Sequence, residues 1–404
     1  MKYVIILGDG MAGYPLPERE NKTCLQIADT PFFDELAKKS TVGLAKTVPA
    51  GFSPGSDVAN LSVMGYDPAE FYTGRSPLEA ASIGIPLTET DVTYRCNLVT
   101  LSEEEPYENK RMLDYSAGEI TTAEARELID ALRAELDRPP FSLHAGISYR
   151  HCLVAHGGMT GSVLTPPHDI TDRPVAGHLP GGTAGKTLLA MMKRSHEILR
   201  DHPVNRARIR AGKNPANSVW FWGEGTKPRL RPFFDLYGKR GAVISAVDLV
   251  KGIGILAGLD VIEVEGATGN WDTNFTGKAD AAANALLSGT DLVYVHMEAP
   301  DECGHHGDVE KKIYSIEQVS RVAQRIAGRL ERAGERYAML VMPDHPTPIA
   351  LKTHTADPVP FLIYRSDSPS GNGAPRYDEE AAGGTGLFVP RACELLRGFL
   401  RLYT

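Results

Sequence analysis

This sequence of 404 residues has few cysteines, no excess of positive charge and no long apolar run. Its five cysteines include no C-x-x-C pair and are odd in number, which argues against a disulfide framework and favours a reducing cytoplasm. The formal net charge of -8 argues against a general nucleic-acid-binding protein. No apolar run approaches the length of a membrane span, and the opening run reaches Asp9 too soon for a signal peptide. We therefore expect a cytoplasmic protein without a nucleic-acid or membrane partner.

The rest of the composition is typical of a folded protein in water. Hydrophobic residues make up 42% of the chain and charged residues 23%. A chain of 404 residues is long for a single hydrophobic core. The length therefore predicts two domains.

Strands and helices alternate in both terminal parts of the sequence. Continuous runs of β-branched and other apolar residues predict buried strands, and spaced apolar residues predict helices between them. The expected strands lie at 3–8, 242–247, 259–264, 290–297, 337–342 and 359–365, and the expected helices at 30–40, 248–257 and 310–334. This alternation predicts an α/β domain with a mostly parallel sheet.

The middle of the sequence has a different pattern. Short strand candidates at 91–101, 147–157 and 161–170 are combined with expected helices at 121–136 and 185–200. This pattern predicts a smaller α+β domain at 88–216, inserted into an α/β domain formed by 1–87 and 217–404. The stretches 84–91 and 211–218 are polar and rich in turn residues, as expected of domain boundaries.

Side chains that can bind metals follow three of the expected parallel strands. They are Asp9, Asp301, His305, Asp344, His345 and, nine residues further on, His354. Because ligands bind beyond the carboxyl ends of the strands in open α/β sheets, we expect these side chains to converge. Three carboxylates and three imidazoles exceed what one Zn²⁺ needs, and mixed oxygen and nitrogen ligands suit two divalent ions that clamp a phosphoryl group. Taken singly, Asp9 fits a turn residue equally well, and His354 fits a surface histidine better.

A di-metal site for phosphoryl transfer also needs a nucleophile. Ser56 follows Pro54 and Gly55 and opens an expected helix, where backbone N–H groups and the helix dipole favour an alkoxide or a phosphate ester. The alternative is that Ser56 is an ordinary N-cap. Ser53 and Ser62 are competing candidates.

Seven stretches, spread over essentially the whole chain, form a recognisable set. They are "GDGMAG", "PGSDVANLSVMGYDP", "YTGRSPLEAASIGI", "RCNLVT", "EAPDECGHHGD", "PDHPTP" and "THTADPVPF". Together they resemble the archaeal-type cofactor-independent phosphoglycerate mutases of the alkaline phosphatase superfamily. The resemblance implies an alkaline-phosphatase-like sheet with helices on both faces. It also implies one metal held by Asp301, His305 and His354, and another held by Asp9, Ser56, Asp344 and His345. Ser56 would become a phosphoserine intermediate.

The resemblance further implies that the inserted domain holds the glycerate while the phosphoryl group moves between its 3- and 2-hydroxyls. The substrate carries a carboxylate and a phosphate, which Arg, Lys or His would bind. The candidates are Arg150, His151, His168, Asp169 and Lys251. For Arg150 and Lys251, a solvated surface charge is an equal alternative.

The identity of the phosphoryl acceptor stays open, because the transfer machinery is shared. Similar bacterial proteins suggest a homoserine kinase as one alternative, and a metal-dependent phosphatase with water as acceptor is another. For the mutase we expect Mn²⁺, with Mg²⁺, Co²⁺ or Zn²⁺ as alternatives, a small phosphorylated substrate and no nucleotide. The sequence predicts no particular oligomeric state.

Overall fold

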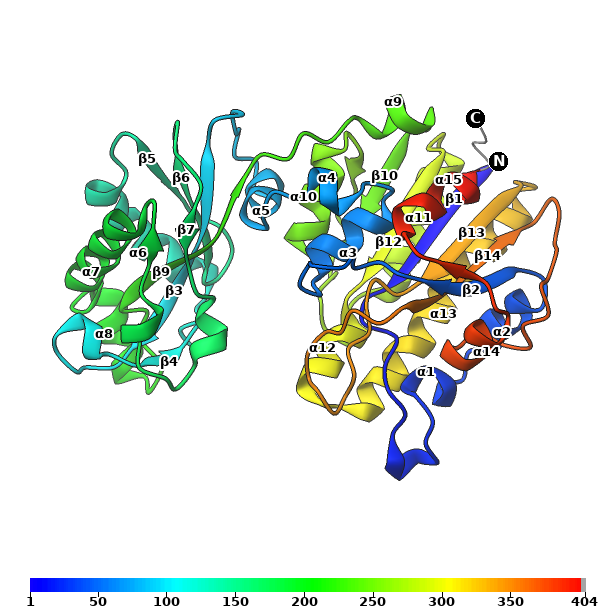
Figure 1. Cartoon of the computed structure of the whole chain (residues 1–404), viewed down its shortest axis with the longest axis horizontal. Helices are drawn as coiled ribbons and strands as arrows, with labels where there is room; N and C mark the ends of the chain where they lie inside the picture. Colours follow the sequence, from blue (N-terminus) through cyan, green and yellow to red (C-terminus); the bar gives the residue numbers. More distant parts are fainter. Residues whose placement is uncertain (401–404) are drawn as a thin grey trace. The chain divides into compact units, whose positions relative to one another are not determined.

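The computed structural model describes residues 1–400 and divides into two compact units. The larger unit comprises residues 1–72 and 229–404, and the smaller comprises residues 73–228 (Figure 1). No helix among residues 1–400 is both long enough and apolar enough to cross a bilayer.

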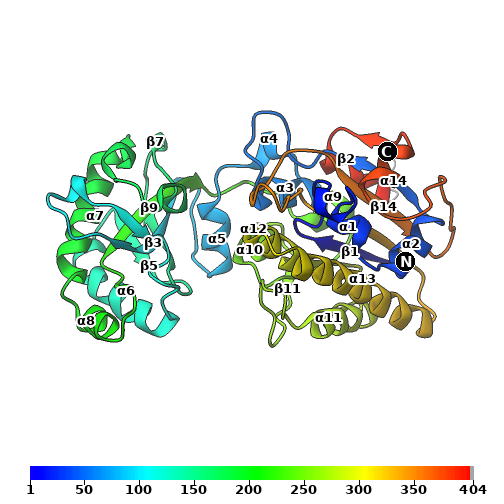
Figure 2. The same ribbon diagram turned by 90° about the horizontal axis from the view of Figure 1, so that it is seen from below.

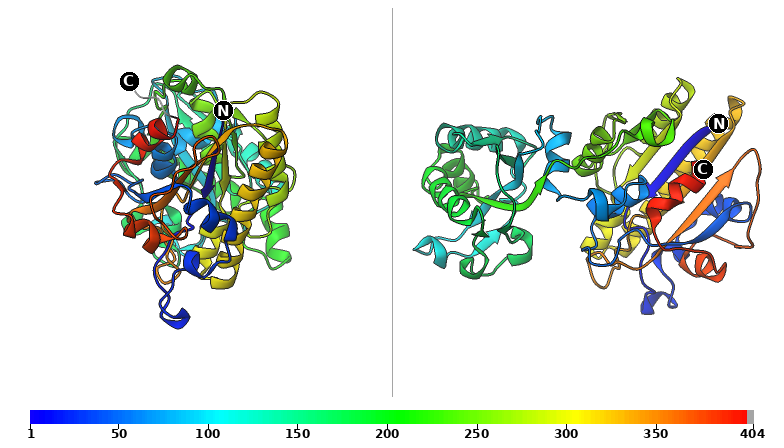
Figure 3. Two further views of the ribbon diagram at one scale, coloured as in Figure 1. Left: turned by 90° about the vertical axis from the view of Figure 1, so that its right-hand side faces the viewer. Right: turned by 45° about the horizontal axis from the view of Figure 1, so that its top comes forward.

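The larger unit is built on an eight-stranded sheet in the order β11-β10-β12-β1-β13-β14-β2-β15. β1 pairs in parallel with both β12 and β13, so the first strand of the chain lies between two strands from its C-terminal half (Figure 3). β14 is the exception, since it runs antiparallel to β13 and β2. The strands are β1 (Lys2–Gly8), β2 (Thr41–Ala45), β10 (Gly241–Ile244), β11 (Asp260–Val261), β12 (Leu292–Met297), β13 (Tyr337–Met342), β14 (Val359–Arg365) and β15 (Phe388–Val389). The carboxyl ends of β1, β12 and β13 therefore meet at one edge.

Helices cover both faces of this sheet. α11 (Phe275–Leu287) and α13 (Val309–Arg332) lie side by side on one face (Figure 2), where they share a core with Val293 and Val295 of β12. The alternate residues of β12 point to the other face, where α3 (Ser56–Val63) and α10 (Asp248–Leu256) pack together. The remaining helices are α1 (Cys24–Ile27), α2 (Pro31–Ala37), α4 (Pro68–Phe71), α9 (Phe233–Tyr237), α12 (Ala299–His306), α14 (Glu379–Gly384) and α15 (Leu395–Leu400). The expected mostly parallel α/β architecture is confirmed.

The smaller unit is an antiparallel sheet with helices packed against it. β3 pairs with β6 on one edge and with β9 on the other, and a separate short pair joins β7 to β8. Its strands are β3 (Val92–Leu101), β4 (Met112–Asp114), β5 (Phe141–His144), β6 (Arg150–Ala155), β7 (Ser162–Val163), β8 (Gly181–Gly182) and β9 (Ser218–Thr226). Its helices are α5 (Ser76–Ser82), α6 (Thr122–Leu136), α7 (Gly185–Leu199) and α8 (Pro203–Arg210). α6 begins with a capping box, in which Thr121 and Glu124 each accept from the other's backbone N–H.

The borders of the smaller unit lie outside the 88–216 expected from the sequence. β9 lies beyond residue 216 and pairs along β3, whose hydrogen-bonding groups would otherwise be unsatisfied at that edge. α5 lies before residue 88 and packs against β3 and β9. The polar stretches at 84–91 and 211–218 therefore precede strands of this unit and do not mark its ends.

Candidate active site

Six of the seven expected metal ligands, all except Ser56, lie in two groups at the carboxyl edge of the larger sheet. Within each group, one ligand atom from every residue lies within 4.8 Å of the others. The first group consists of Asp301, His305 and His354, and the second of Asp9, Asp344 and His345.

The first group combines one short helix with one loop. Asp301 and His305 lie four residues apart on α12, so both side chains project from the same helix face. Nε2 of His305 is 3.1 Å from Oδ2 of Asp301, and Nε2 of His354 is 3.3 Å from Oδ1. The two Nε2 atoms lie 2.8 Å apart. One carboxylate and two imidazoles therefore face a common point.

The other nitrogen of each ring in this group is fixed by a main-chain carbonyl. Nδ1–H of His305 donates to the carbonyl of Lys352 at 2.9 Å, and Nδ1–H of His354 donates to that of Pro54 at 3.3 Å. In a neutral imidazole the proton on Nδ1 leaves Nε2 as a lone pair. Two lone pairs and a carboxylate then converge, an arrangement that fits a divalent cation.

The second group is more deeply buried. Asp9 follows β1, while Asp344 and His345 follow β13, and each is at most 1% exposed. Backbone N–H groups of Gly10 and His345 donate to Oδ1 of Asp344 at 3.1 and 2.8 Å. Oδ1 of Asp9 is buried without a hydrogen-bond partner and lies 3.7 Å from Nε2 of His345. Because an unsatisfied buried carboxylate oxygen is costly, this atom also fits a metal ligand.

The pKa values of the two carboxyl groups Asp9 and Asp301 are shifted in opposite directions. Burial and the charge of Asp344 raise the pKa of Asp9 well above its usual value. Burial would also raise the pKa of Asp301, but hydrogen bonds from His305 and His354 hold it well below its usual value. Burial alone would lower the pKa of His305, yet its interaction with Asp301 raises it to about 9. Negative charge is thus balanced by imidazole in the first group and uncompensated in the second, where a cation would relieve it.

The two groups are neighbours. The rings of His345 and His354 stack with centroids 3.8 Å apart. Thr347 Oγ1 donates to Oδ1 of Asp301 and lies 3.3 Å from Nδ1 of His345. Gly10 has a φ of +60°, and a Cβ there would lie 2.6 Å from Oδ1 of Asp301, so this turn requires glycine. The geometry fits two adjacent metal sites.

Ser56 is the first residue of α3, directly beside the second group. The N-cap is Gly55, and Ser56 Oγ lies 3.2 Å from Nε2 of His345. The alternative reading of Ser56 as the N-cap is therefore wrong. Ser53 is exposed, and Ser62 is buried and donates to the carbonyl of Thr47. Of the three candidate serines, Ser56 is the one placed against an expected ligand.

Asn60, which sequence reasoning missed, links Ser56 to Asp344. Its Nδ2 donates to the carbonyl of Ser56 at 2.8 Å and to Oδ2 of Asp344 at 3.0 Å. Tyr294 on β12 donates its hydroxyl to Oδ1 of Asn60 at 2.6 Å, which fixes the orientation of the amide. A polar residue in an otherwise apolar helix turn was the available signal.

Two of the expected substrate-binding residues belong to one cluster of the smaller unit. Arg150 lies over the ring of Tyr149, and the ring of His168 lies 5.2 Å from that of Trp222. Tyr115 bridges the two pairs, at 6.0 Å from both Tyr149 and His168.

The same cluster contains Arg95, which sequence reasoning also missed. Its guanidinium lies 3.9 Å above the ring of Trp222 and 2.7 Å from a carboxylate oxygen of Glu79. An arginine within a continuously buried strand was a usable signal, because a buried charge needs partners.

The other expected substrate-binding residues lie elsewhere. His151 pairs with Cys96 across the sheet and points to the face opposite Arg150, where it is 5% exposed. This placement argues against contact with a substrate, since successive strand residues face opposite sides. Asp169 is exposed beside His168, with 3.6 Å between Oδ1 and Nε2. Lys251 lies on α10 of the larger unit, with its Nζ 2.7 Å from Glu263 Oε1.

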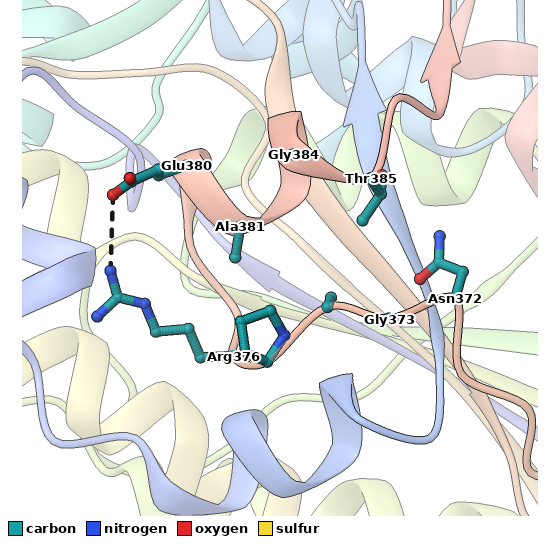
Figure 4. A pocket seen from close by; sticks show the side chains of 9 residues that line it. Asn372, Gly373, Arg376, Glu380, Ala381, Gly384 and Thr385 are labelled. Carbon is teal, nitrogen blue, oxygen red and sulfur yellow. Dashed lines mark ion pairs between the residues drawn. The ribbon is translucent and has the colours of Figure 1, made fainter.

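A surface hollow of about 390 Å³ in the larger unit is lined by none of the expected site residues. It lies between residues 372–376 and 380–385, and Figure 4 shows the side chain of Arg376 directed at Glu380. Arg376 also pairs with the buried Asp378. Its positive charge is therefore already balanced by two carboxylates.

Comparisons with known proteins agree with this geometry. The family model for 2,3-bisphosphoglycerate-independent phosphoglycerate mutase matches residues 37–205. A protein of that name from Methanosarcina barkeri is 51% identical over 398 residues, covering 98% of each chain. A probable 2,3-bisphosphoglycerate-independent phosphoglycerate mutase from Geobacter sulfurreducens is 49% identical over 402 residues, covering 99% of this chain and 100% of the relative.

Two solved structures resemble the whole chain. A Pyrococcus horikoshii protein superposes with a TM-score of 0.82 at 28% identity, covering 100% of this chain and 98% of its own. The cofactor-independent phosphoglycerate mutase of Thermoplasma acidophilum gives a TM-score of 0.65 at 25% identity, with both chains fully covered. The chain therefore belongs to the 2,3-bisphosphoglycerate-independent phosphoglycerate mutase family.

Proposed function

We propose that this chain interconverts 3-phosphoglycerate and 2-phosphoglycerate through a phosphoserine at Ser56. The observation that supports this most directly is the 3.2 Å contact between Ser56 Oγ and His345 Nε2, beside two groups of metal-binding side chains. Relatives about 50% identical over nearly the full chain are named as mutases of this kind, which favours this reading over a homoserine kinase.

Two divalent ions would be held at this site, one by each group. The first would bind Asp301, His305 and His354, and the second would bind Asp9, Asp344, His345 and Ser56. When bound, such ions supply Lewis-acid stabilisation of a transferring phosphoryl group and lower the pKa of a serine hydroxyl. We infer Mn²⁺ as the native ion, because mixed carboxylate and imidazole ligands suit a divalent ion of this kind. Mg²⁺, Co²⁺ and Zn²⁺ stay alternatives.

Ser56 would accept and return the phosphoryl group. The oxygen–phosphorus bond to O3 of the glycerate breaks as a bond to Ser56 Oγ forms, and the proton of the serine hydroxyl passes to O3. In the return step the bond between Ser56 Oγ and phosphorus breaks as a bond to O2 forms, and the proton of the 2-hydroxyl returns to the serine. Because Ser56 is the first residue of α3, the helix dipole and the backbone N–H groups of the first turn favour negative charge at that point. No nucleotide and no 2,3-bisphosphoglycerate take part.

The glycerate would be retained by the smaller unit during this exchange. We assign Arg150 and His168 to this task from the sequence, and we add Arg95 because Glu79 and Trp222 hold its guanidinium in place. Arginine binds carboxylates and phosphates through paired N–H groups, which suits a small acid such as glycerate.

We also infer that the chain works in the cytoplasm. Its five cysteines are all free and buried, as expected of a protein that folds in a reducing compartment.

The test is ³¹P NMR of the Mn²⁺-loaded protein with 3-phosphoglycerate and no nucleotide, run beside homoserine plus ATP. We expect a 2-phosphoglycerate signal in the first sample. Product only from homoserine plus ATP would establish the kinase, and inorganic phosphate alone would establish a phosphatase.

A further inference from the structure

A second layer of buried polar side chains lies behind Asp9. His296, near the end of β12, places Nε2 at 2.9 Å from Oδ2 of Asp9. Its Nδ1 lies 3.1 Å from Oγ of Ser245, which follows β10. The exposed fractions of Asp9, Ser245 and His296 are 1%, 3% and 0%, so water does not compete for these hydrogen bonds.

The hydrogen bonds in this layer have one consistent direction. The form of Asp9 that binds a metal ion is the ionised carboxylate, which can only accept, so in that form the bond to Asp9 places the imidazole proton on Nε2. Nδ1 must then accept from the hydroxyl of Ser245. That hydroxyl oxygen receives the N–H of Val247 at 3.0 Å, which leaves its hydrogen directed at Nδ1. Ser245 therefore selects the tautomer of His296, and His296 in turn donates to Asp9.

This donation divides the two oxygens of Asp9. Oδ2 is occupied by His296, whereas Oδ1 is buried without a hydrogen-bond partner and faces Nε2 of His345. We propose that His296, held by Ser245, is a positioning residue that presents Oδ1 of Asp9 to the metal ion of the second group. The proposal rests on the proposed function only in taking the second group as a metal site.

The first group is supported in a different way. His305 and His354 are oriented by the backbone carbonyls of Lys352 and Pro54, and no bond from Ser245 or His296 reaches them. Removing His296 should therefore weaken the binding of one ion and leave the binding of the other unchanged. A general loss of folding would weaken the binding of both ions.

The main chain around His296 is held independently of its ring. The buried Lys278 on α11 donates Nζ–H to the carbonyl of His296 at 3.2 Å, and β12 pairs on both sides with β1 and β10. A side-chain substitution at His296 therefore leaves this part of the backbone anchored.

The experiment is calorimetric titration of the metal-free full chain with Mn²⁺, without substrate. Supporting residues of this kind typically contribute 10- to 100-fold to metal affinity. We expect His296→Leu to weaken one of two Mn²⁺ ions by about that factor. His296→Gln keeps an N–H donor near the position of Nε2 and should restore most of the affinity. In Ser245→Ala the tautomer of His296 is no longer selected, so the Mn²⁺ affinity should lie between those of His296→Leu and His296→Gln.

His196→Leu is the matched control, because it removes a buried histidine of the smaller unit whose Nδ1 bonds to the carbonyl of Asn217. It should leave both Mn²⁺ affinities unchanged. Equal weakening of both ions by His296→Leu, or equal affinities in His296→Gln and His296→Leu, would overturn the proposal. If His296→Leu does not fold, Ser245→Ala decides, since wild-type affinity in that variant contradicts the proposed relay. Failure of the mutase assignment would appear separately, as wild-type protein that binds two Mn²⁺ ions but converts no 3-phosphoglycerate.

Discussion

Ser56 Oγ and His345 Nε2 lie 3.2 Å apart, although 289 positions separate the two residues in the chain. The parallel sheet produces this contact, because His345 follows β13 at the edge where α3 begins with Ser56. The same edge carries Asp9 after β1 and Asp301 after β12. One fold element therefore gathers the expected nucleophile and the expected metal ligands from four distant segments.

Loss of a carboxylate from either of the two groups should lower the metal content and abolish activity. We expect Asp301→Ala and Asp344→Ala each to lower the bound Mn²⁺ measured by elemental analysis and to abolish phosphoryl transfer, because each removes a ligand from a different group. Asp235→Ala changes an exposed aspartate of the same unit and serves as the control. Two tightly bound ions in either ligand variant would show that the ligands are misassigned.

Tyr294→Phe should slow transfer without affecting substrate binding. Without the hydroxyl, the amide of Asn60 loses the bond that orients it between Ser56 and Asp344. We expect kcat to fall by up to about 100-fold, the order of magnitude for a misplaced reacting group, with KM little changed. Tyr237→Phe, which removes a comparable buried hydroxyl bonded to the carbonyl of Gly65, should keep wild-type kcat. Equal kinetics in the two variants would contradict the role given to Asn60.

Stability of the smaller unit should fall in acid because of His151. Burial lowers the pKa of His151 to about 3, whereas an unfolded histidine has a pKa of about 6.5. Between these values the unfolded chain binds more protons, so the free energy of unfolding decreases as pH falls below 6.5, by up to about 1.4 kcal/mol per pH unit.

His151→Asn keeps an acceptor for the backbone N–H of Gly146 and should flatten this dependence. Urea unfolding, followed by the fluorescence of Trp220 and Trp222, measures it between pH 7 and pH 4. His178→Asn, at a position outside the core, should retain the wild-type dependence of the free energy of unfolding on pH. Identical slopes in wild type and His151→Asn would rule out this residue as the cause.

Arg150→Ala should separate retention of glycerate from chemistry at Ser56. If Arg150 helps to hold the glycerate, its loss lets glycerate escape before the phosphoserine returns its phosphoryl group, and water becomes the acceptor. The ratio of inorganic phosphate to isomerised product should then rise while mutase activity falls. Arg210→Ala, an exposed arginine on α8, should leave the ratio unchanged. An unchanged ratio in Arg150→Ala would move the holding role to Arg95 or His168.

The sequence was most informative where chemistry follows strand ends. Three of the expected ligands come directly after, or a few residues after, a short apolar run that predicts a buried strand. They are Asp9, Asp301 and Asp344. Parallel strands bring their carboxyl ends together whatever the intervening chain length, so convergence could be predicted. The roles of these residues in metal binding stay predictions.

Other features depended on packing that no local pattern reveals. β9 could not be assigned to the smaller unit, because its partner β3 lies more than a hundred residues earlier and the polar stretch before β9 resembles a boundary. His151 was grouped with Arg150 by sequence proximity, yet adjacent strand residues face opposite sides.

Besides Asn60, two further residues that sequence reasoning missed left detectable signals. Arg95 and His296 are polar residues inside strands that are otherwise fully buried, and each has a partner that satisfies it. A buried polar residue in a strand is thus a sign of a specific interaction, although the partner has to be found in the structure.

The most direct measurement is mass spectrometry of the Mn²⁺-loaded protein quenched shortly after 3-phosphoglycerate is added. We expect phosphate on the peptide that contains Ser56, and we expect neither a phosphorylated peptide nor 2-phosphoglycerate in Ser56→Ala. That variant should remain folded, because Ser56 makes no cap bond and even a lost cap costs only about 1 kcal/mol. Ser53→Ala should behave as wild type. Phosphate on Ser53 or Ser62, or a Ser56→Ala variant that still forms 2-phosphoglycerate, would contradict the account.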